Sequence, residues 1–189
     1  AVFHLMTHAF FKALLFMGAG SVIHSLHGEQ DMNRMGGLSA ALPATSLTCT
    51  IAAFAIAGIF PLAGFFSKDA ILFSAMTSER GGLGFWLAGA VGALLTAFYM
   101  FRLLFKTFYG RCNLSMEEQR NLHESPATMT LPLKVLAVLS FIGGWVGIPI
   151  ISGANIFDGF LAPVFGGAGE AHHEVLFELA MMVVSLAIA

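Results

Sequence analysis

The stretch HLMTHAFFK, residues 4–12, opens an apolar run that continues to Ile23. In a helix, a spacing of four residues places His4, His8 and Lys12 about 40° apart around the axis and ~6 Å apart along it, on one slanted polar stripe. A lysine at mid-bilayer costs roughly 3 kcal/mol on the translocon scale, so this stripe is predicted to line a bundle interior or a wet cavity. The stretch therefore predicts a membrane helix and the first candidate functional site.

The composition indicates an all-α, polytopic membrane protein. The chain is 57% hydrophobic and 11% charged, with a mean hydropathy of +0.81. Soluble domains are less apolar and about twice as charged, near 25%. The net charge is −2 without a basic run, which excludes nucleic acid as an expected partner. Both ends lie inside apolar segments and there is no initiator methionine, so we expect a fragment of a longer polypeptide.

The hydropathy pattern predicts about five transmembrane helices in one proton-translocating membrane domain. They are expected near residues 3–23, 43–76, 83–105, 131–151 and 175–189. The second would measure roughly 50 Å as one straight helix, too long for a single crossing. Because Pro61 removes a backbone donor and Gly64 eases a change of direction, this helix is predicted to be discontinuous at Pro61 to Gly64. The second half is expected to start near Ser67, and Pro132 to lie in the first turn of the fourth span.

Lys68 and Asp69 follow the predicted break directly. A broken helix at membrane depth with a charged residue beside the break is typical of a transport site. At the start of a second half-helix the helix dipole disfavours a charged lysine, whereas a neighbouring carboxylate favours it. We therefore predict that both residues take part in ion movement. The alternative is a static salt bridge between Lys68 and Asp69 that anchors the break.

The two histidines also allow other interpretations. A single histidine in an apolar helix is usually hydrogen-bonded packing, but three ionisable groups on one face favour a proton or ion path. Histidine suits such a path, because its reference pKa of about 6.5 allows both forms at neutral pH. Two histidines four apart could also bind a metal or haem, but Leu5 stands where the zinc-protease motif has glutamate. We expect no metal site here, nor at His172-His173, which fits an exposed polar loop.

Basic residues predict the orientation in the membrane. The side reached after the first and third spans carries Arg34, Lys106, Arg111 and Arg120, whereas the other side carries only Arg80. By the positive-inside rule the first side is cytoplasmic. Basic residues at the end of the third span are expected to snorkel to the interface. The glutamates of the polar loops are expected to be solvated: Glu117, Glu118 and Glu124.

Four motifs resemble one known family. They are HLMTHAFFKALLF at 4–16, GAGSVI at 18–23, MGGL at 35–38 and PLAGFFSKD at 61–69. Together they are similar to the antiporter-like subunits of respiratory complex I, NADH:quinone oxidoreductase, of the subunit L or ND five type. The resemblance covers about the first 110 residues, and beyond them only the hydropathy agrees. The chain would then be a piece of the later half of such a subunit.

The resemblance implies proton translocation driven by quinone reduction elsewhere in the complex. By position, His4, His8 and Lys12 would form the connecting relay, with Lys68 as the terminal lysine toward the outer side. The chain would be part of an enzyme without redox chemistry of its own, because flavin, iron–sulfur clusters and quinone belong to other parts of the complex. Its partners would be the lipid bilayer of the bacterial inner membrane and other membrane subunits, above all a neighbouring antiporter-like one.

Other classes of function remain open at this point. Subunits of multi-subunit cation/proton antiporters and of membrane-bound hydrogenases share these motifs, and gene neighbours would separate them. A structural or assembly subunit would hold the polar stripe as satisfied packing, without water connecting it to Lys68. A membrane metalloenzyme would show metal on analysis of the purified protein.

Overall fold

The computed structural model describes residues 2–78, 80–147 and 156–165, and every regular element in these ranges is a helix. This confirms the all-α class. The elements are α1 (Val2–Ser25), α2 (Pro43–Ala57), α3 (Ala63–Thr77), α4 (Leu83–Leu104), the π-helical turn η1 (Phe105–Tyr109), α5 (Met116–Asn121), α6 (Ala127–Ile142) and α7 (Ile156–Phe165).

Two of these helices are long and apolar enough to cross a membrane. They are α1 and the continuous run of α4 with η1, which extends the predicted third span to Tyr109. The other described apolar helices, including α2 and α6, are shorter. The number of spans therefore stays a prediction. The expected fifth span, 175–189, and the histidine pair at 172–173 lie outside the described residues.

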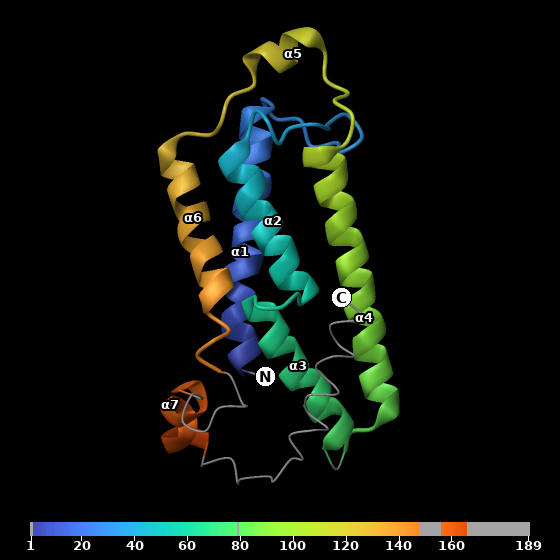
Figure 1. Cartoon of the computed structure of the whole chain (residues 1–189), viewed down its shortest axis with the longest axis vertical. Coiled ribbons are helices and arrows are strands. Elements are labelled where there is room, and N and C mark those ends of the chain that lie inside the picture. Colours follow the sequence, from blue (N-terminus) through green and yellow to red (C-terminus); the bar gives the residue numbers. More distant parts are fainter. Residues whose placement is uncertain (1, 79, 148–155, 166–189) are drawn as a thin grey trace.

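The long axis of the molecule is set by α1, α2, α4 and α6, which stand side by side (Figure 1). Helix α2 packs against α1, α4 and α6. Helix α3 continues beyond the end of α2 and packs against α1, α4 and α6 as well. The connection from α1 to α2 and the short helix α5 lie at one end, here called the loop end, and α7 lies at the other (Figure 1).

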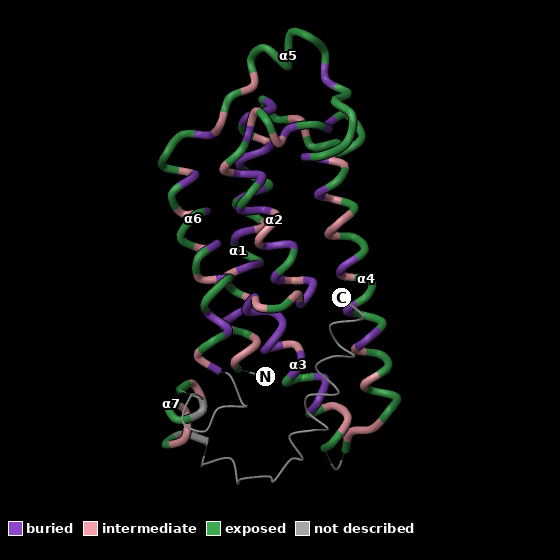
Figure 2. The backbone as a smooth tube through the Cα atoms, viewed as in Figure 1, coloured by how far each residue is buried: buried purple, intermediate pink, exposed green. Residues whose placement is uncertain are grey.

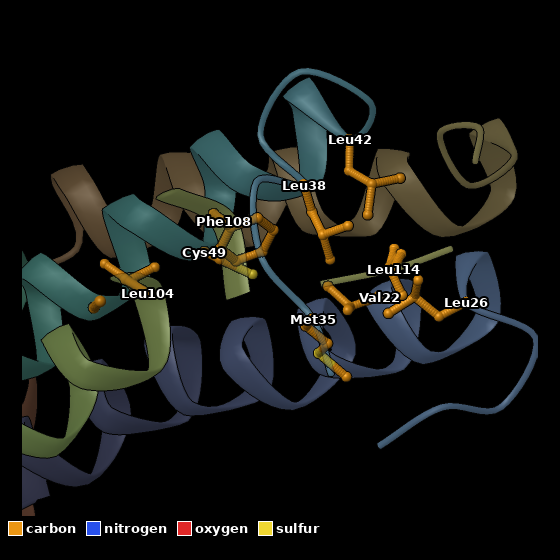
Figure 3. Close-up of a cluster of buried hydrophobic side chains, with 10 residues drawn as sticks. Val22, Leu26, Met35, Leu38, Leu42, Cys49, Leu104, Phe108 and Leu114 are labelled. Carbon is orange, nitrogen blue, oxygen red and sulfur yellow. The ribbon is translucent and has the colours of Figure 1, made fainter. Parts of the chain in front are cut away.

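The core is concentrated on α1, α2 and the first turns of α3, whereas α4 keeps a broad exposed apolar side (Figure 2). Near the loop end a cluster of buried apolar side chains joins α1, α2, η1 and the connecting segments (Figure 3). Small residues allow the close approach: a Cβ on Gly18 would collide with the sulfur of Cys49. Gly18 therefore lets α1 approach α2 closely, whereas a Cβ on Gly20 would meet open space.

The predicted break is confirmed, but its position needs correction. Helix α2 ends at Ala57 and α3 begins at Ala63, so the break occupies residues 58–62. The glycine that ends α2 is Gly58, which has a φ of 92° and closes a Schellman motif in which the Ile59 N–H donates to the Phe54 carbonyl at 3.0 Å. Gly64 already belongs to α3, where its missing side chain lets the helix abut the Ala55 carbonyl.

Two further boundaries differ from the prediction. The second half-helix starts at Ala63 and not near Ser67, because Leu62 is already its N-cap. Helix α6 spans residues 127–142 and not 131–151, which makes Pro132 its sixth residue. One missing N–H removes only one bond of the ladder, and the helix continues past it. Gly144 follows the end of α6 and comes so close to Ala63 that a Cβ would collide with it.

Candidate functional site

A buried hydroxyl network joins the start of α1 to α3. The Thr7 hydroxyl donates to Ser67 Oγ at 2.8 Å, and Ser67 Oγ lies 3.0 Å from Nδ1 of His4. The Ser67 hydroxyl also donates to the Ala63 carbonyl, which lies one turn earlier in α3, at 3.1 Å. Thr7 and Ser67 are at most 1% exposed, so this network fixes the His4 ring against α3.

The polar stripe of α1 continues from His4 towards Lys12. The rings of His4 and His8 lie 5.7 Å apart between centroids, and Phe11 meets His8 edge-on at 5.4 Å. Both histidines are half-buried, whereas Lys12 is exposed in the chain as described. The helical spacing of four thus places all three groups on one side of α1, as the sequence predicted.

Lys68 reaches back across the break to the end of α2. Its Nζ donates to the carbonyls of Ile56 at 2.8 Å and Ala57 at 3.1 Å. The last carbonyls of a helix carry the negative end of its dipole, so they favour the ammonium. The sequence led us to expect that the N-terminus of the second half-helix disfavours the charged form of Lys68. This expectation is wrong, because α3 starts at Ala63, five residues before Lys68, and Lys68 lies in its second turn.

Two cavities meet at Lys68. The larger, an open cavity of about 420 Å³, is bordered by His4, His8 and Lys12 on α1, by Lys68 on α3, and by α4. The smaller, of about 10 Å³, lies between Gly58, Lys68 and Asp69 and has the minimum size for one water. Asp69 itself is buried at 3% exposure. The structure thus brings all the ionisable candidates from the sequence to two adjoining cavities.

Sequence reasoning missed the part that Ser67 plays and misjudged Glu124. Glu124 was expected to be solvated, but it is half-buried and accepts bonds from the N–H groups of Ala44 at 2.7 Å and Thr45 at 3.2 Å. The reason is that α2 begins after Leu42, whose side chain cannot cap the free N–H groups of the first turn. Glu117 and Glu118 are exposed, as expected. No local sequence signal links Ser67 or Glu124 to its distant partners.

Comparison with known proteins places this arrangement in a family. Residues 1–96, which contain the stripe of α1, the break and Lys68, match the family described as NADH:quinone oxidoreductase/Mrp antiporter, TM. The chain belongs to this antiporter family. It is therefore a membrane protein, as its composition predicted.

Several relatives in the antiporter family are similar along most of the chain. NADH-quinone oxidoreductase subunit L of Mycobacterium tuberculosis is 46% identical over 196 residues, which cover all of this chain and 30% of the relative. NADH-ubiquinone oxidoreductase chain 5 of Triticum aestivum is 45% identical over 148 residues, covering 77% of this chain and 22% of the relative. The chain thus spans less than a third of the length of these relatives.

A solved structure shows the same fold. A chain of the Mrp complex from Dietzia sp. superposes with a TM-score of 0.69 and 24% sequence identity, over 99% of this chain and 20% of that chain. At this identity the likeness concerns the fold alone.

Proposed function

We propose that this chain is part of an antiporter-like, proton-translocating membrane subunit of NADH:quinone oxidoreductase. The observation that carries the proposal is the open cavity on which His4, His8, Lys12 and Lys68 meet beside a broken helix. Relatives that match this chain at 43 to 46% identity bear the name subunit L. Quinone reduction elsewhere in the complex would drive the movement of protons, and this chain would contribute no redox step.

The geometry supports a stepwise path. Protons would pass along the α1 stripe, with His4 and His8 close enough to exchange through at most one water, and cross the open cavity to Lys68. Water would fill the gaps that are too long for direct transfer. The carbonyls of Ile56 and Ala57 would hold the ammonium form of Lys68 in place between transfers.

Lys68 is suited to act as the exit group because it borders both cavities. Asp69 also lines the small cavity and would attract the departing proton. By the positive-inside argument the loop end is cytoplasmic, so this route would lead to the outer side of the bacterial inner membrane. Asp69 would thus follow Lys68 in the path.

The exposure of Lys12 indicates where partners belong. A lysine in the apolar α1 would not face lipid, and the cavity that it borders is open. Further helices of the same subunit, or a neighbouring antiporter-like subunit, would close this side. The proposal includes about five spans in all.

A subunit of a cation/proton antiporter is the second candidate. The Mrp complex from Dietzia sp. favours it through the shared fold and the shared family. The first candidate fits better, because its relatives reach 46% identity against 24% for the Mrp chain.

The test is the proton-to-electron stoichiometry of the full-length complex with Lys68→Ala. Pumping should fall while NADH oxidation by the rest of the complex continues. Lys134→Ala removes an exposed lysine of α6 that borders neither cavity and is the matched control. An unchanged stoichiometry in Lys68→Ala, or an equal loss in Lys134→Ala, would overturn the proposal.

A further inference from the structure

The N-terminus of α2 is capped by a residue far away in the sequence. Glu124, in the segment between α5 and α6, accepts the N–H groups of Ala44 and Thr45, and the Thr45 hydroxyl donates to its other oxygen at 2.6 Å. The residue at the N-cap position, Leu42, offers no side-chain acceptor. The position of the first turn of α2 therefore depends on this carboxylate.

Buried hydroxyls extend this cap to α1. Ser21 Oγ lies 2.8 Å from Thr45 Oγ1 and donates to Ser125 Oγ at 2.7 Å. Ser125 directly follows Glu124, and the three hydroxyl residues are at most 5% exposed. The carboxylate is thus held in one position against both α1 and α2.

The opposite end of α2 holds Lys68. A helix of 15 residues is about 22 Å long. A carboxylate at its N-terminus and an ammonium at its C-terminus both interact favourably with the helix dipole. The two charged side chains therefore bind the same half-helix at its two ends.

The buried residues on the sides of α2 are small: Thr45, Ser46, Thr48, Cys49, Ala52, Ala53, Ala55 and Ala57. Small residues let neighbouring helices approach closely, so these contacts set the distance between α2 and its neighbours. Beyond Ala57 the chain leaves the helix at the break. The cap at one end and the Lys68 contact at the other therefore act together with the packing of the sides in setting where the last carbonyls of α2 stand.

We propose that Glu124 is a positioning residue for Lys68. By capping α2 it keeps the carbonyls of Ile56 and Ala57 where they can accept the Lys68 ammonium. Loss of the cap lets α2 shift and weakens the grip on Lys68, although Glu124 never touches the cavity. The effect on pumping rests on the proposed function, whereas the shift of α2 does not.

The experiment uses the full-length protein in its complex, with Ile59→Cys in the break carrying a nitroxide spin label. A whole N-cap is worth about fivefold in equilibrium. Glu124→Gln removes the charge and one of the two acceptor oxygens, so it should raise the displaced component of the label's EPR spectrum by up to about fivefold. The proton-to-electron stoichiometry should fall with NADH oxidation unchanged. Glu117→Gln, an exposed glutamate of α5, is the matched control and should change neither readout.

An unchanged label spectrum in Glu124→Gln overturns the proposal, even if pumping falls, because a local role at the loop end would not reach the break. A moved label with full pumping overturns it as well. If the complex with Glu124→Gln does not assemble, the same two measurements are made on Thr45→Val. This variant removes one hydrogen bond to the Glu124 carboxylate and keeps the charge of Glu124. It should shift both readouts in the same direction by less. The spectrum of the label does not depend on pumping. A failure of the proposed function, which the Lys68→Ala test would reveal, can therefore be distinguished from a failure of this proposal.

Discussion

Replacement of Ser67 by alanine should weaken the contact between α1 and α3. Ser67 Oγ bonds to Thr7 and His4, both on α1, and to the Ala63 carbonyl within α3. Only the first two bonds hold the two helices together. Thr7 keeps a second acceptor in the His4 carbonyl at 3.2 Å, so its own hydroxyl is not left without an acceptor.

The expected magnitude follows from this count. A hydrogen bond between membrane helices is worth about 0.6 kcal/mol on average, so two such bonds amount to about 1 kcal/mol. Ser74→Ala is the matched control, because Ser74 is exposed in the same helix and its hydroxyl donates to the Ala70 carbonyl at 2.8 Å. Its loss should cost close to nothing, since the bond lies within one helix.

The assay is equilibrium unfolding of the full-length subunit in mixed micelles, with a double-mutant cycle that combines Ser67→Ala and Thr7→Val. The two substitutions should show a coupling free energy of about 0.6 kcal/mol, the worth of the bond between them. Additive effects, or a loss in Ser67→Ala no larger than in Ser74→Ala, would show that the network does not hold α1 to α3.

Three further predictions concern the break and the loop end. Gly58→Ala should lower the free energy of unfolding by about 1–2 kcal/mol, because Gly58 has a left-handed φ of 92°. The control is Gly92→Ala in α4, where a Cβ would meet open space and the free energy of unfolding should not fall. Equal effects of the two substitutions would contradict this prediction. Gly64→Ala should separate α2 from α3 and reduce pumping, measured as proton-to-electron stoichiometry, and an unaltered value would count against the close contact. The pKa of Glu118 is lowered from its ordinary value of 4.5, mainly by a hydrogen bond from the Ser115 side chain and next by one from the Ser115 backbone. The bonds that the Glu118 carboxylate accepts in the α5 capping box should therefore be complete above pH 4.5 and lost as the pH falls through the lowered pKa, while the bond from the Glu118 N–H to Ser115 remains. Amide exchange of α5 that does not change over this pH range would refute the prediction.

The break shows what local sequence signals can predict. Pro61 in an apolar segment too long for one crossing was sufficient to predict two half-helices. The pattern did not reveal which nearby glycine ends the first one, because Gly58 and Gly64 both flank the proline. Only the backbone shows that the left-handed residue is Gly58, and that Gly64 serves a close contact between helices.

Contacts between residues that lie far apart in the sequence could not be predicted from local patterns. The helical period alone placed His4, His8 and Lys12 on one face, since that relation is local. The acceptors of Lys68 lie across the break, and the cap of α2 comes from Glu124, 80 residues after Ala44. Such pairs depend on how helices pack, which no spacing within one helix encodes.

The proposed path requires water to join Lys12 and His8 to Lys68 through the cavity of about 420 Å³. The most direct measurement is a cryo-EM map of the full-length complex at a resolution that shows ordered water. We expect a hydrogen-bonded chain of water between these three side chains, closed off from lipid by neighbouring helices. A dry cavity filled by apolar side chains or acyl chains, with Lys12 isolated from Lys68, would contradict the proposed path.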